Sequence, residues 1–184
     1  FPLPPSPAHA MPAALDAIDW KLLDLLQRDA RMTNVDLARA VDLSPSPCLA
    51  RVRALEEAGL IDRYVTLLDA HRLGLQVSVF IQVRLERQIE AALETFEKAM
   101  ADRPEVMECY LMTGNADYLL RVVVPDLAAL QEFIVNFLSR VPGIGNLQSS
   151  VALKQVKYQT ALPLHGGERA ARKNAPGGRR ARKP

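Results

Sequence analysis

The stretch Val77-Ser-Val-Phe-Ile-Gln-Val-Arg-Leu85 divides the chain, because each of its odd-numbered positions is apolar. Alternation with a period of two residues predicts a β-strand that buries one face. The segments before this stretch have the apolar spacing of helices, whereas the segments after it alternate between helix and strand. We therefore expect a helical N-terminal part and a mixed C-terminal part.

The segments that follow this strand predict a small αβ domain. Apolar residues at helical spacing over 89–100 and 127–141 predict two helices. The apolar runs 106–112 and 118–124 predict two strands, and a last strand is expected over about 147–158. The order β-α-β-β-α-β is that of a ferredoxin-like sandwich, a four-stranded antiparallel sheet with helices on one face.

Before the strand, the pattern predicts three short helices and then a β-rich run over 60–68. The first helix has an apolar stripe, and the second follows Thr33, a good N-cap. The third is expected to begin with Ser46 as its N-cap and Pro47 at its first helical position, and to end at Gly59. This arrangement is typical of a winged helix-turn-helix. The expected fold class is therefore α+β, with a winged helix-turn-helix followed by a ferredoxin-like βαββαβ sandwich.

Composition adds two terminal segments to these domains. The first 14 residues contain five prolines, and the chain beyond residue 163 is rich in Gly, Ala, Pro and Arg without apolar periodicity. We expect a disordered lead over 1–14, the helix-turn-helix domain over 15–68, a linker over 69–76, the ferredoxin-like domain over 77–162 and a disordered basic tail over 163–184.

Charge is distributed unevenly along the 184 residues. The net charge is only +2, but residues 166–184 hold seven Lys or Arg and one acid, which leaves 16 basic and 20 acidic residues in the first 165. A cationic tail adds affinity for nucleic-acid phosphates that depends on salt and not on base sequence. A solubilising terminus without that role is the alternative.

Several classes of protein do not fit the sequence. No apolar run approaches the roughly 20 residues that cross a bilayer, so no membrane partner is expected. Two cysteines, Cys48 and Cys109, cannot form a disulfide framework and favour a cytoplasmic location. Motifs of the HExxH, CxxC, GxSxG and Walker types are missing from the sequence. We expect no enzyme, no catalytic residues, no metal and no cofactor.

The third predicted helix carries the candidate contacts to nucleic acid. Its apolar face, which should pack on the other two helices, centres on Leu49, Val52 and Leu55. The opposite face has small residues flanked by two arginines, and its members include Ser46, Pro47, Ala50, Arg51 and Arg53. Small residues let a helix backbone approach base edges in a major groove, and arginine reaches phosphates or guanine. An ordinary solvated helix face is the alternative.

Several motifs together resemble the Lrp/AsnC family of bacterial and archaeal transcription regulators over residues 15–162. They include Leu15-Asp-Ala-Ile-Asp-Trp-Lys-Leu-Leu23, Asp29-Ala-Arg31, Leu43-Ser-Pro-Ser-Pro-Cys-Leu-Ala-Arg-Val-Arg-Ala-Leu-Glu-Glu-Ala-Gly-Leu-Ile61, Gly114-Asn-Ala-Asp-Tyr-Leu-Leu120, Val124-Pro-Asp126 and Pro142-Gly143. The Ser-Pro-Ser-Pro-Cys segment is most similar to the leucine-responsive branch. The resemblance implies a sequence-specific DNA-binding regulator of amino-acid metabolism that is associated with the bacterial nucleoid.

The resemblance also implies roles for individual residues. The small residues and arginines of the third helix would face double-stranded DNA, with Asn34 and Arg63 as contacts to its backbone. The αβ domain would pair through its sheets into dimers that close into tetramers or octamers. An amino-acid effector, leucine or another apolar amino acid, would bind between dimers and change assembly and operator binding. The implied effector residues are Gly114, Asp117 and Tyr118, with Leu127, Ser150 and Val151 nearby.

Some readings stay open at this point. The segment Gly114-Asn-Ala-Asp117 is either a plain hairpin turn or a site where Asp117 pairs with an α-ammonium group. Asn115 departs from the family pattern, in which an acid is common. Arg121 either pairs with Glu108 across an oligomer or lies on a solvated edge. Two other functions remain as alternatives: a DNA-architectural protein with little effector response, or an amino-acid-binding module that acts on an enzyme.

Overall fold

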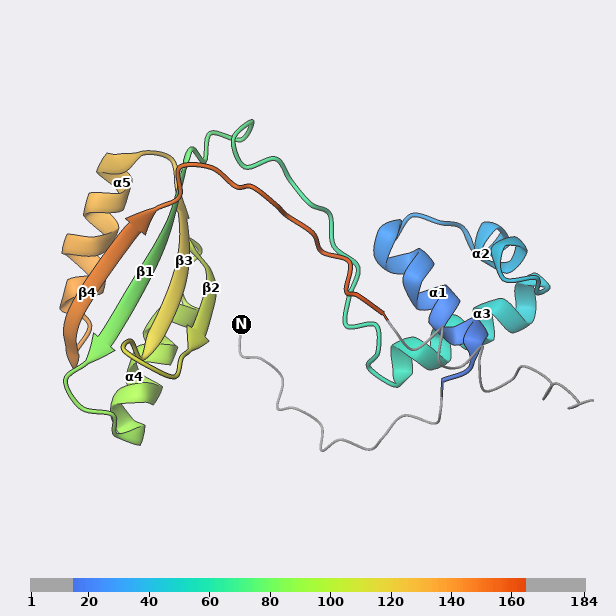
Figure 1. The fold of residues 1–184 in the computed structure, drawn as a ribbon, viewed down its shortest axis with the longest axis horizontal. Helices are drawn as coiled ribbons and strands as arrows, with labels where there is room; N and C mark the ends of the chain where they lie inside the picture. The colour runs from blue at the N-terminus through green and yellow to red at the C-terminus, as the bar shows by residue number, and fades with distance from the viewer. Residues whose placement is uncertain (1–14, 165–184) are drawn as a thin grey trace, which may run out of the picture. The chain divides into compact units, whose positions relative to one another are not determined.

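The computed structural model describes residues 15–164, which fall into two compact units (Figure 1). Residues 15–66 together with 157–164 belong to a helical unit, and residues 67–156 form an αβ unit. The expected lead over 1–14 and the seven basic residues of the tail lie outside the described residues. No helix in the described part of the chain is long and apolar enough to cross a membrane.

The helical unit contains three helices: α1 (Ala17–Arg28), α2 (Asn34–Ala40) and α3 (Pro45–Glu57). A capping box starts α1, because the Asp16 side chain accepts from the Asp19 N–H and the Asp19 side chain accepts from the Asp16 N–H. Thr33 caps α2 by accepting from the Asp36 N–H, as expected. The buried residues of the three helices form one core: Leu22, Leu26, Leu37, Ala38, Val41, Cys48, Val52 and Leu55. The helix-turn-helix prediction is confirmed.

The start of α3 differs from the expectation. The helix begins at Pro45 with Ser44 as its N-cap, two residues before the expected start at Ser46 and Pro47. Both prolines fit the first turn, since its backbone N–H groups have no partner within the helix in any case. The expected end is correct. Gly59 has φ +69, and the Leu60 N–H donates to the Leu55 carbonyl over 3.0 Å, which closes the last turn.

The β-rich run after α3 does not form a strand. Residues 60–68 have no regular secondary structure, and their large apolar side chains, including Tyr64, Val65 and Leu68, are exposed. Among the described residues, the helical unit contains no other strand with which this run could pair. A high β-propensity is not sufficient without a neighbouring strand, so the expected strand of the wing is absent from the described chain.

The αβ unit has the expected element order. Its elements are β1 (Val77–Leu85), α4 (Glu90–Ala101), β2 (Val106–Leu111), β3 (Tyr118–Val124), α5 (Leu127–Glu132) and β4 (Ile144–Val151). A π-helical turn (Phe133–Phe137) and a 3-10 turn (Leu138–Arg140) extend α5. The sheet has the order β2-β3-β1-β4, and all of its neighbours are antiparallel. The ferredoxin-like order is therefore confirmed.

Both helices of the αβ unit cover the same face of the sheet (Figure 1). Phe96 of α4 and Phe133 of the π-helical turn after α5 share one buried core with β1 and β3 residues such as Ile81 and Leu120. The last strand is shorter than expected, since it ends at Val151 and not near residue 158. Because β4 runs antiparallel to β1, the pairing of Val151 with Val79 brings β4 to the start of β1. The residues after Val151 therefore pass the end of β1 and have no β1 residues to pair with.

Candidate nucleic-acid interface and ligand region

The exposed side of α3 carries most of the predicted contact residues. Ser46, Pro47, Ala50 and Arg53 are all exposed, and Arg53 makes no ion pair with any residue that the structure describes. The helix is rotated slightly from the expected orientation, because Leu49 is 38% exposed whereas Cys48 is completely buried. Burial also raises the pKa of the Cys48 thiol, which makes this side chain a packing residue and not a reactive one.

Arg51 does not lie on the open face with Arg53. Its Nη1 donates to Asp16 Oδ2 over 2.8 Å and to Asp19 Oδ1 over 2.7 Å. These are the two carboxylates that cap α1, so one guanidinium links α3 to the first turn of α1. Arg51 was expected to face DNA beside Arg53, but in the structure its side chain turns to the acids of a neighbouring helix, which a helical wheel does not show.

Opposite charges in this cluster shift one another's pKa values. Burial acts to raise the pKa of Asp16, but the Asp19 backbone N–H and Arg51 outweigh that effect and hold the pKa below its ordinary value. The hydrogen bonds that Arg51 donates to Asp19 and to Asp16 raise the pKa of Arg51. The charged forms of Asp16 and Arg51 are therefore both favoured in the folded state, and the cluster ties α3 to the start of α1. The sequence signal was Asp16-x-x-Asp19 at the start of a helix, which sequence reasoning did not use.

Asn34 and Arg63 were expected to contact the DNA backbone. The Asn34 Nδ2 donates to the Pro45 carbonyl over 2.8 Å, which ties the start of α2 to the start of α3. Its Oδ1 is buried and has no hydrogen-bond partner in the described part of the chain. Arg63 is exposed and lies 3.5 Å from Asp62. Of the two side chains, Arg63 is exposed and Asn34 is only partly exposed.

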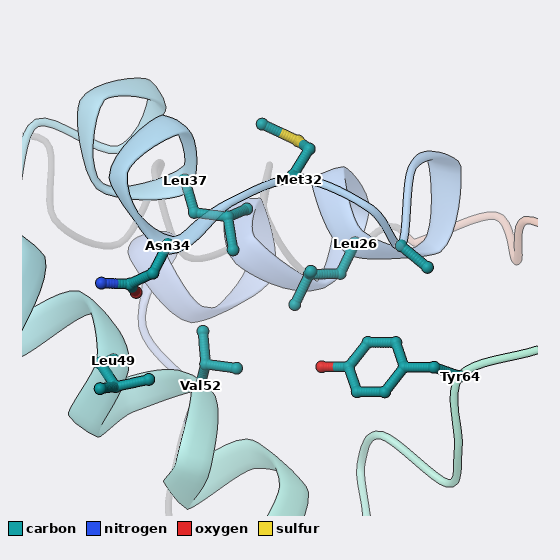
Figure 2. A pocket seen from close by; sticks show the side chains of 8 residues that line it. Leu26, Met32, Asn34, Leu37, Leu49, Val52 and Tyr64 are labelled. Atoms are coloured by element: carbon teal, nitrogen blue, oxygen red, sulfur yellow. The ribbon is translucent and has the colours of Figure 1, made fainter.

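A shallow apolar pocket lies beside α3 (Figure 2). Leu26, Leu37 and Val52 form its walls, and the Tyr64 ring closes one side with its hydroxyl directed inward. That hydroxyl donates to Glu56 Oε1 over 2.8 Å. Burial, together with Glu56, raises the pKa of Tyr64 to about 12. Tyr64 thus anchors the extended segment after α3 to α3 itself, a role that the sequence did not indicate.

The turn between β2 and β3 contains the first group of predicted effector residues. Gly114 has φ +117, a conformation that L side chains rarely adopt, and it is exposed. Asp117 is only 5% exposed. Its Oδ2 accepts from the Leu85 N–H over 2.7 Å, and its Oδ1 accepts from Gln88. Both oxygens are used within the chain, so this carboxylate does not present the open site for an α-ammonium that we expected.

Tyr118 is also an internal residue. It is 1% exposed, and its ring lies on Phe96 with centroids 4.5 Å apart. Its hydroxyl donates to Glu97 Oε1 over 2.7 Å, and burial together with Glu97 raises its pKa. Asp117 and Tyr118 therefore support the turn from inside, and only Gly114 of the three faces solvent.

The remaining predicted effector residues lie at the other end of the sheet. Val151 is aligned with Val79 of β1, which is aligned with Val122 near the end of β3. Leu127 follows that end of β3 and is 64% exposed. Ser150 and Val151 are exposed as well. Because Gly114 precedes the start of β3, a single protomer does not bring the two groups together.

Arg121 and Glu108 pair within one sheet. They are opposite residues on β3 and β2, and Arg121 Nη1 donates to Glu108 Oε1 over 2.8 Å. The ion pair is therefore internal to the protomer, and the expectation of a pair across an oligomer is not needed to explain either residue.

Comparison with known proteins matches both units. Residues 15–62 match a family described as winged helix-turn-helix DNA-binding, and residues 78–162 match the Lrp/AsnC ligand binding domain. The chain is 49% identical over 152 residues to the Bkd operon transcriptional regulator of Pseudomonas aeruginosa, covering 83% of this chain and 99% of the relative. It is 40% identical over 150 residues to the leucine-responsive regulatory protein of Escherichia coli, covering 82% and 92%.

Solved structures show the same similarity. A transcriptional regulator of Neisseria meningitidis in complex with L-methionine superposes with a TM-score of 0.79 at 40% identity, covering 82% of this chain and 97% of that one. The AsnC protein of Escherichia coli superposes with a TM-score of 0.71 at 25% identity, covering 80% and 98%. These relatives are transcriptional regulators with the same order of helical and αβ parts.

Proposed function

The chain belongs to the Lrp/AsnC family of DNA-binding transcriptional regulators, and from that premise we propose which residues contact DNA and how a ligand alters that contact. The relatives named above are bacterial regulators, and we infer the same setting, at the nucleoid, for this chain. The αβ unit is the ligand-binding part of the family, so the proposed effector is an amino acid.

The proposed DNA-contact surface is the exposed side of α3. The observation that carries this proposal is the combination of small exposed residues, Ser46, Pro47 and Ala50, with the exposed guanidinium of Arg53, which forms no ion pair within residues 15–164. The small residues permit close approach to base edges, and Arg53 supplies a fork of donors for guanine or phosphate. Arg63 adds a contact to the DNA backbone. Arg51 and Asn34 hold α3 in place instead of contacting bases.

The proposed assembly unit is a dimer formed through the open face of the sheet. Phe80 is 39% exposed and Tyr110 is 52% exposed on that face, which the helices do not cover. Covering such apolar side chains favours self-association. A two-fold dimer would present two α3 helices to a pseudo-palindromic site, with half-sites about one helical turn apart.

The proposed effector region combines two protomers. Gly114 and the group Leu127, Ser150 and Val151 lie at opposite ends of one sheet, so they form a common site only where copies meet. A neutral amino acid such as leucine fits this proposal, and the L-methionine in the related structure supports the same class. The ligand would shift the assembly equilibrium by its different affinity for the two states, and so change operator occupancy.

The proposal is tested by DNA-binding measurements on the full chain. Arg53→Ala should weaken binding to the DNA upstream of its own gene by roughly 5-fold or more, as for a lost base or phosphate contact. Lys98→Ala, on α4 of the αβ unit, removes a charge without touching α3 and should leave affinity unchanged. Equal affinity of the Arg53→Ala variant and the parent would refute the assignment of α3. Binding without any dependence on DNA sequence would favour an architectural protein.

A further inference from the structure

The last described residues of the chain are bonded to the first helix. Residues 157–164 belong to the helical unit, although they follow β4 in the sequence. The Gln27 Oε1 accepts from the Leu162 N–H over 2.8 Å, and the Gln27 Nε2 donates to the Leu162 carbonyl over 3.1 Å. One side-chain amide of α1 therefore bonds both backbone groups of a residue that is 135 positions away in the sequence.

The sequence around Leu162 favours this contact. Pro163 follows directly, and a residue that precedes a proline prefers an extended conformation to a helical one. The N–H and the carbonyl of an extended residue point to the same side of the chain, so one partner residue of an antiparallel strand can bond both. The Gln27 amide takes the place of that partner. Because the Leu162 side chain is 68% exposed, the attachment is made by the backbone.

Asp24 determines the orientation of the Gln27 amide. The Gln27 Nε2 also donates to Asp24 Oδ1 over 3.1 Å, three residues earlier on α1. A primary amide has two N–H donors on its nitrogen and an acceptor on its oxygen. With one N–H on Asp24 and the other on the Leu162 carbonyl, the amide oxygen faces the Leu162 N–H. Both donors and the oxygen are therefore used, which holds Gln27 in one orientation.

This attachment lies shortly before the basic residues of the tail. The first of the seven is Arg169, which follows Leu162 by seven residues and lies outside the described part of the chain. A stretch of that length spans at most about 25 Å. Measured from Val151, where β4 ends, Arg169 is 18 residues away, and the span reaches about 65 Å. The bond to Gln27 therefore shortens the free length before the first base by more than half.

We propose that Gln27 anchors the basic tail to the helical unit, so that the tail binds phosphates of the same duplex DNA that α3 contacts. This proposal rests on the proposed DNA contact through α3 and adds a second contact to it. The partner is the sugar-phosphate backbone beside the α3 site, which Lys and Arg neutralise without reading the base sequence. Gln27 is a positioning residue in this arrangement and does not touch DNA.

The expected size of the effect follows from the length of the linker. For a linker without regular structure, as the composition beyond residue 163 predicts, the effective concentration falls roughly as the −3/2 power of the length. Loss of the anchor moves the last fixed residue from Leu162 back to Val151, which lowers the effective concentration of Arg169 near DNA about 4-fold. Later bases are affected less, so Gln27→Ala should weaken DNA binding by about 2- to 4-fold.

The test measures binding of the full chain to the DNA upstream of its own gene by fluorescence anisotropy, with two tails. One tail is natural, and in the other the seven basic residues are replaced by serine. Gln27→Ala should weaken binding only when the tail is natural. Gln159→Ala is the matched control, because the Gln159 side chain donates to the Ala161 carbonyl within the same segment. This control should leave the affinity unchanged with either tail.

Hydrogen exchange tests the contact itself. The Leu162 amide should exchange about 5-fold faster in Gln27→Ala, as expected for the loss of one hydrogen bond. Alanine is a strong helix former and Gln27 is partly exposed, so the helical unit should remain folded. Fluorescence of Trp20 in urea checks this. A variant that unfolds more easily would lose affinity with both tails alike, so the comparison of tails still separates anchoring from stability.

Three results would overturn the proposal. The first is equal affinity of Gln27→Ala and the parent when the tail is natural. The second is the same loss of affinity with the natural tail and with the serine tail, and the third is parent-like affinity of the serine tail alone. None of them bears on α3, which Arg53→Ala tests separately. If Arg53→Ala weakens binding and Gln27→Ala does not, only the anchor is refuted.

Discussion

Arg51 Nη1 donates to Asp19 Oδ1 over 2.7 Å, and this contact joins α3 to the first turn of α1. The same nitrogen also donates to Asp16 over 2.8 Å. Arg51 is one third exposed and Asp19 is 17% exposed, so the cluster is screened from water more than a surface ion pair is. The orientation of α3 therefore depends on a contact within the helical unit.

Arg51→Ala should destabilise the helical unit by about 1 kcal/mol, because it removes two charge-assisted hydrogen bonds that are partly screened by solvent. The only tryptophan of the chain, Trp20, lies on α1 and reports unfolding of this unit by fluorescence in urea. Arg28→Ala breaks an exposed pair with Asp24, which water screens, and should therefore cost less than Arg51→Ala. The role of Arg51 would be disproved if both variants unfolded at the same urea concentration.

The same cluster predicts a dependence of stability on acid. The pKa of Asp16 is lower in the folded state than its ordinary value of 3.8. A group of this kind stabilises the fold above its unfolded-state pKa, and the stabilisation is lost as pH falls through the folded-state pKa. The urea midpoint from Trp20 fluorescence should therefore fall as pH drops below about 4.

Arg51→Ala should reduce that acid dependence, because Asp16 then loses part of the interaction that lowers its pKa. We expect the difference in midpoint between parent and variant to be largest at neutral pH and to shrink as the solution becomes more acidic. A difference that stays constant from pH 7 to pH 2.5 would mean that Arg51 does not act through these carboxylates.

Some elements could be predicted from sequence because one local rule was sufficient. The alternation over 77–85 defined β1 and the face that it buries, and Gly59 marked the end of α3. The start of α3 was misplaced because two Ser-Pro pairs satisfy the same capping rule. The end of β4 was misplaced because apolar residues continue beyond Val151. At that point the antiparallel β4 has reached the first residues of β1, and no further β1 residues remain to pair with.

The roles of the site's side chains were harder to predict, because these side chains bond to residues that are distant in the sequence. Arg51 lies 32 residues from its partner Asp19, and Asp117 lies 32 residues from the Leu85 N–H that it accepts. No pattern within a helix or a turn reports such partners. The exposed small residues of α3 were predicted correctly because they lie far from the apolar stripe, where a slight rotation of the helix does not change their exposure.

Removal of residues 166–184 should flatten the salt dependence of DNA binding. This segment holds seven basic residues, and each phosphate neutralised contributes a slope of about −0.9 in log affinity against log salt. Anisotropy measurements over a series of salt concentrations compare the truncated and full chains. A matched chain in which the seven bases are replaced by serine separates charge from length, and an unchanged slope in both chains would exclude a tethering role for the tail.

Asp117→Asn should destabilise the αβ unit instead of acting through ligand contacts. The carboxylate accepts from the Leu85 N–H on one oxygen and from Gln88 on the other, whereas an amide directs an N–H₂ group at one of these donors. A buried donor that faces another donor costs about 1–3 kcal/mol.

Hydrogen exchange provides the measurement for this prediction. The Leu85 amide should exchange faster in Asp117→Asn than in the parent, and unfolding in urea followed by circular dichroism should shift to lower concentration. Asn115→Ala, at an exposed position of the same turn, should change neither. If Asp117→Asn has normal exchange and stability but binds amino acids more weakly, the prediction is wrong and Asp117 belongs to the ligand site. A carboxylate that the fold does not need is available to bind an ammonium group.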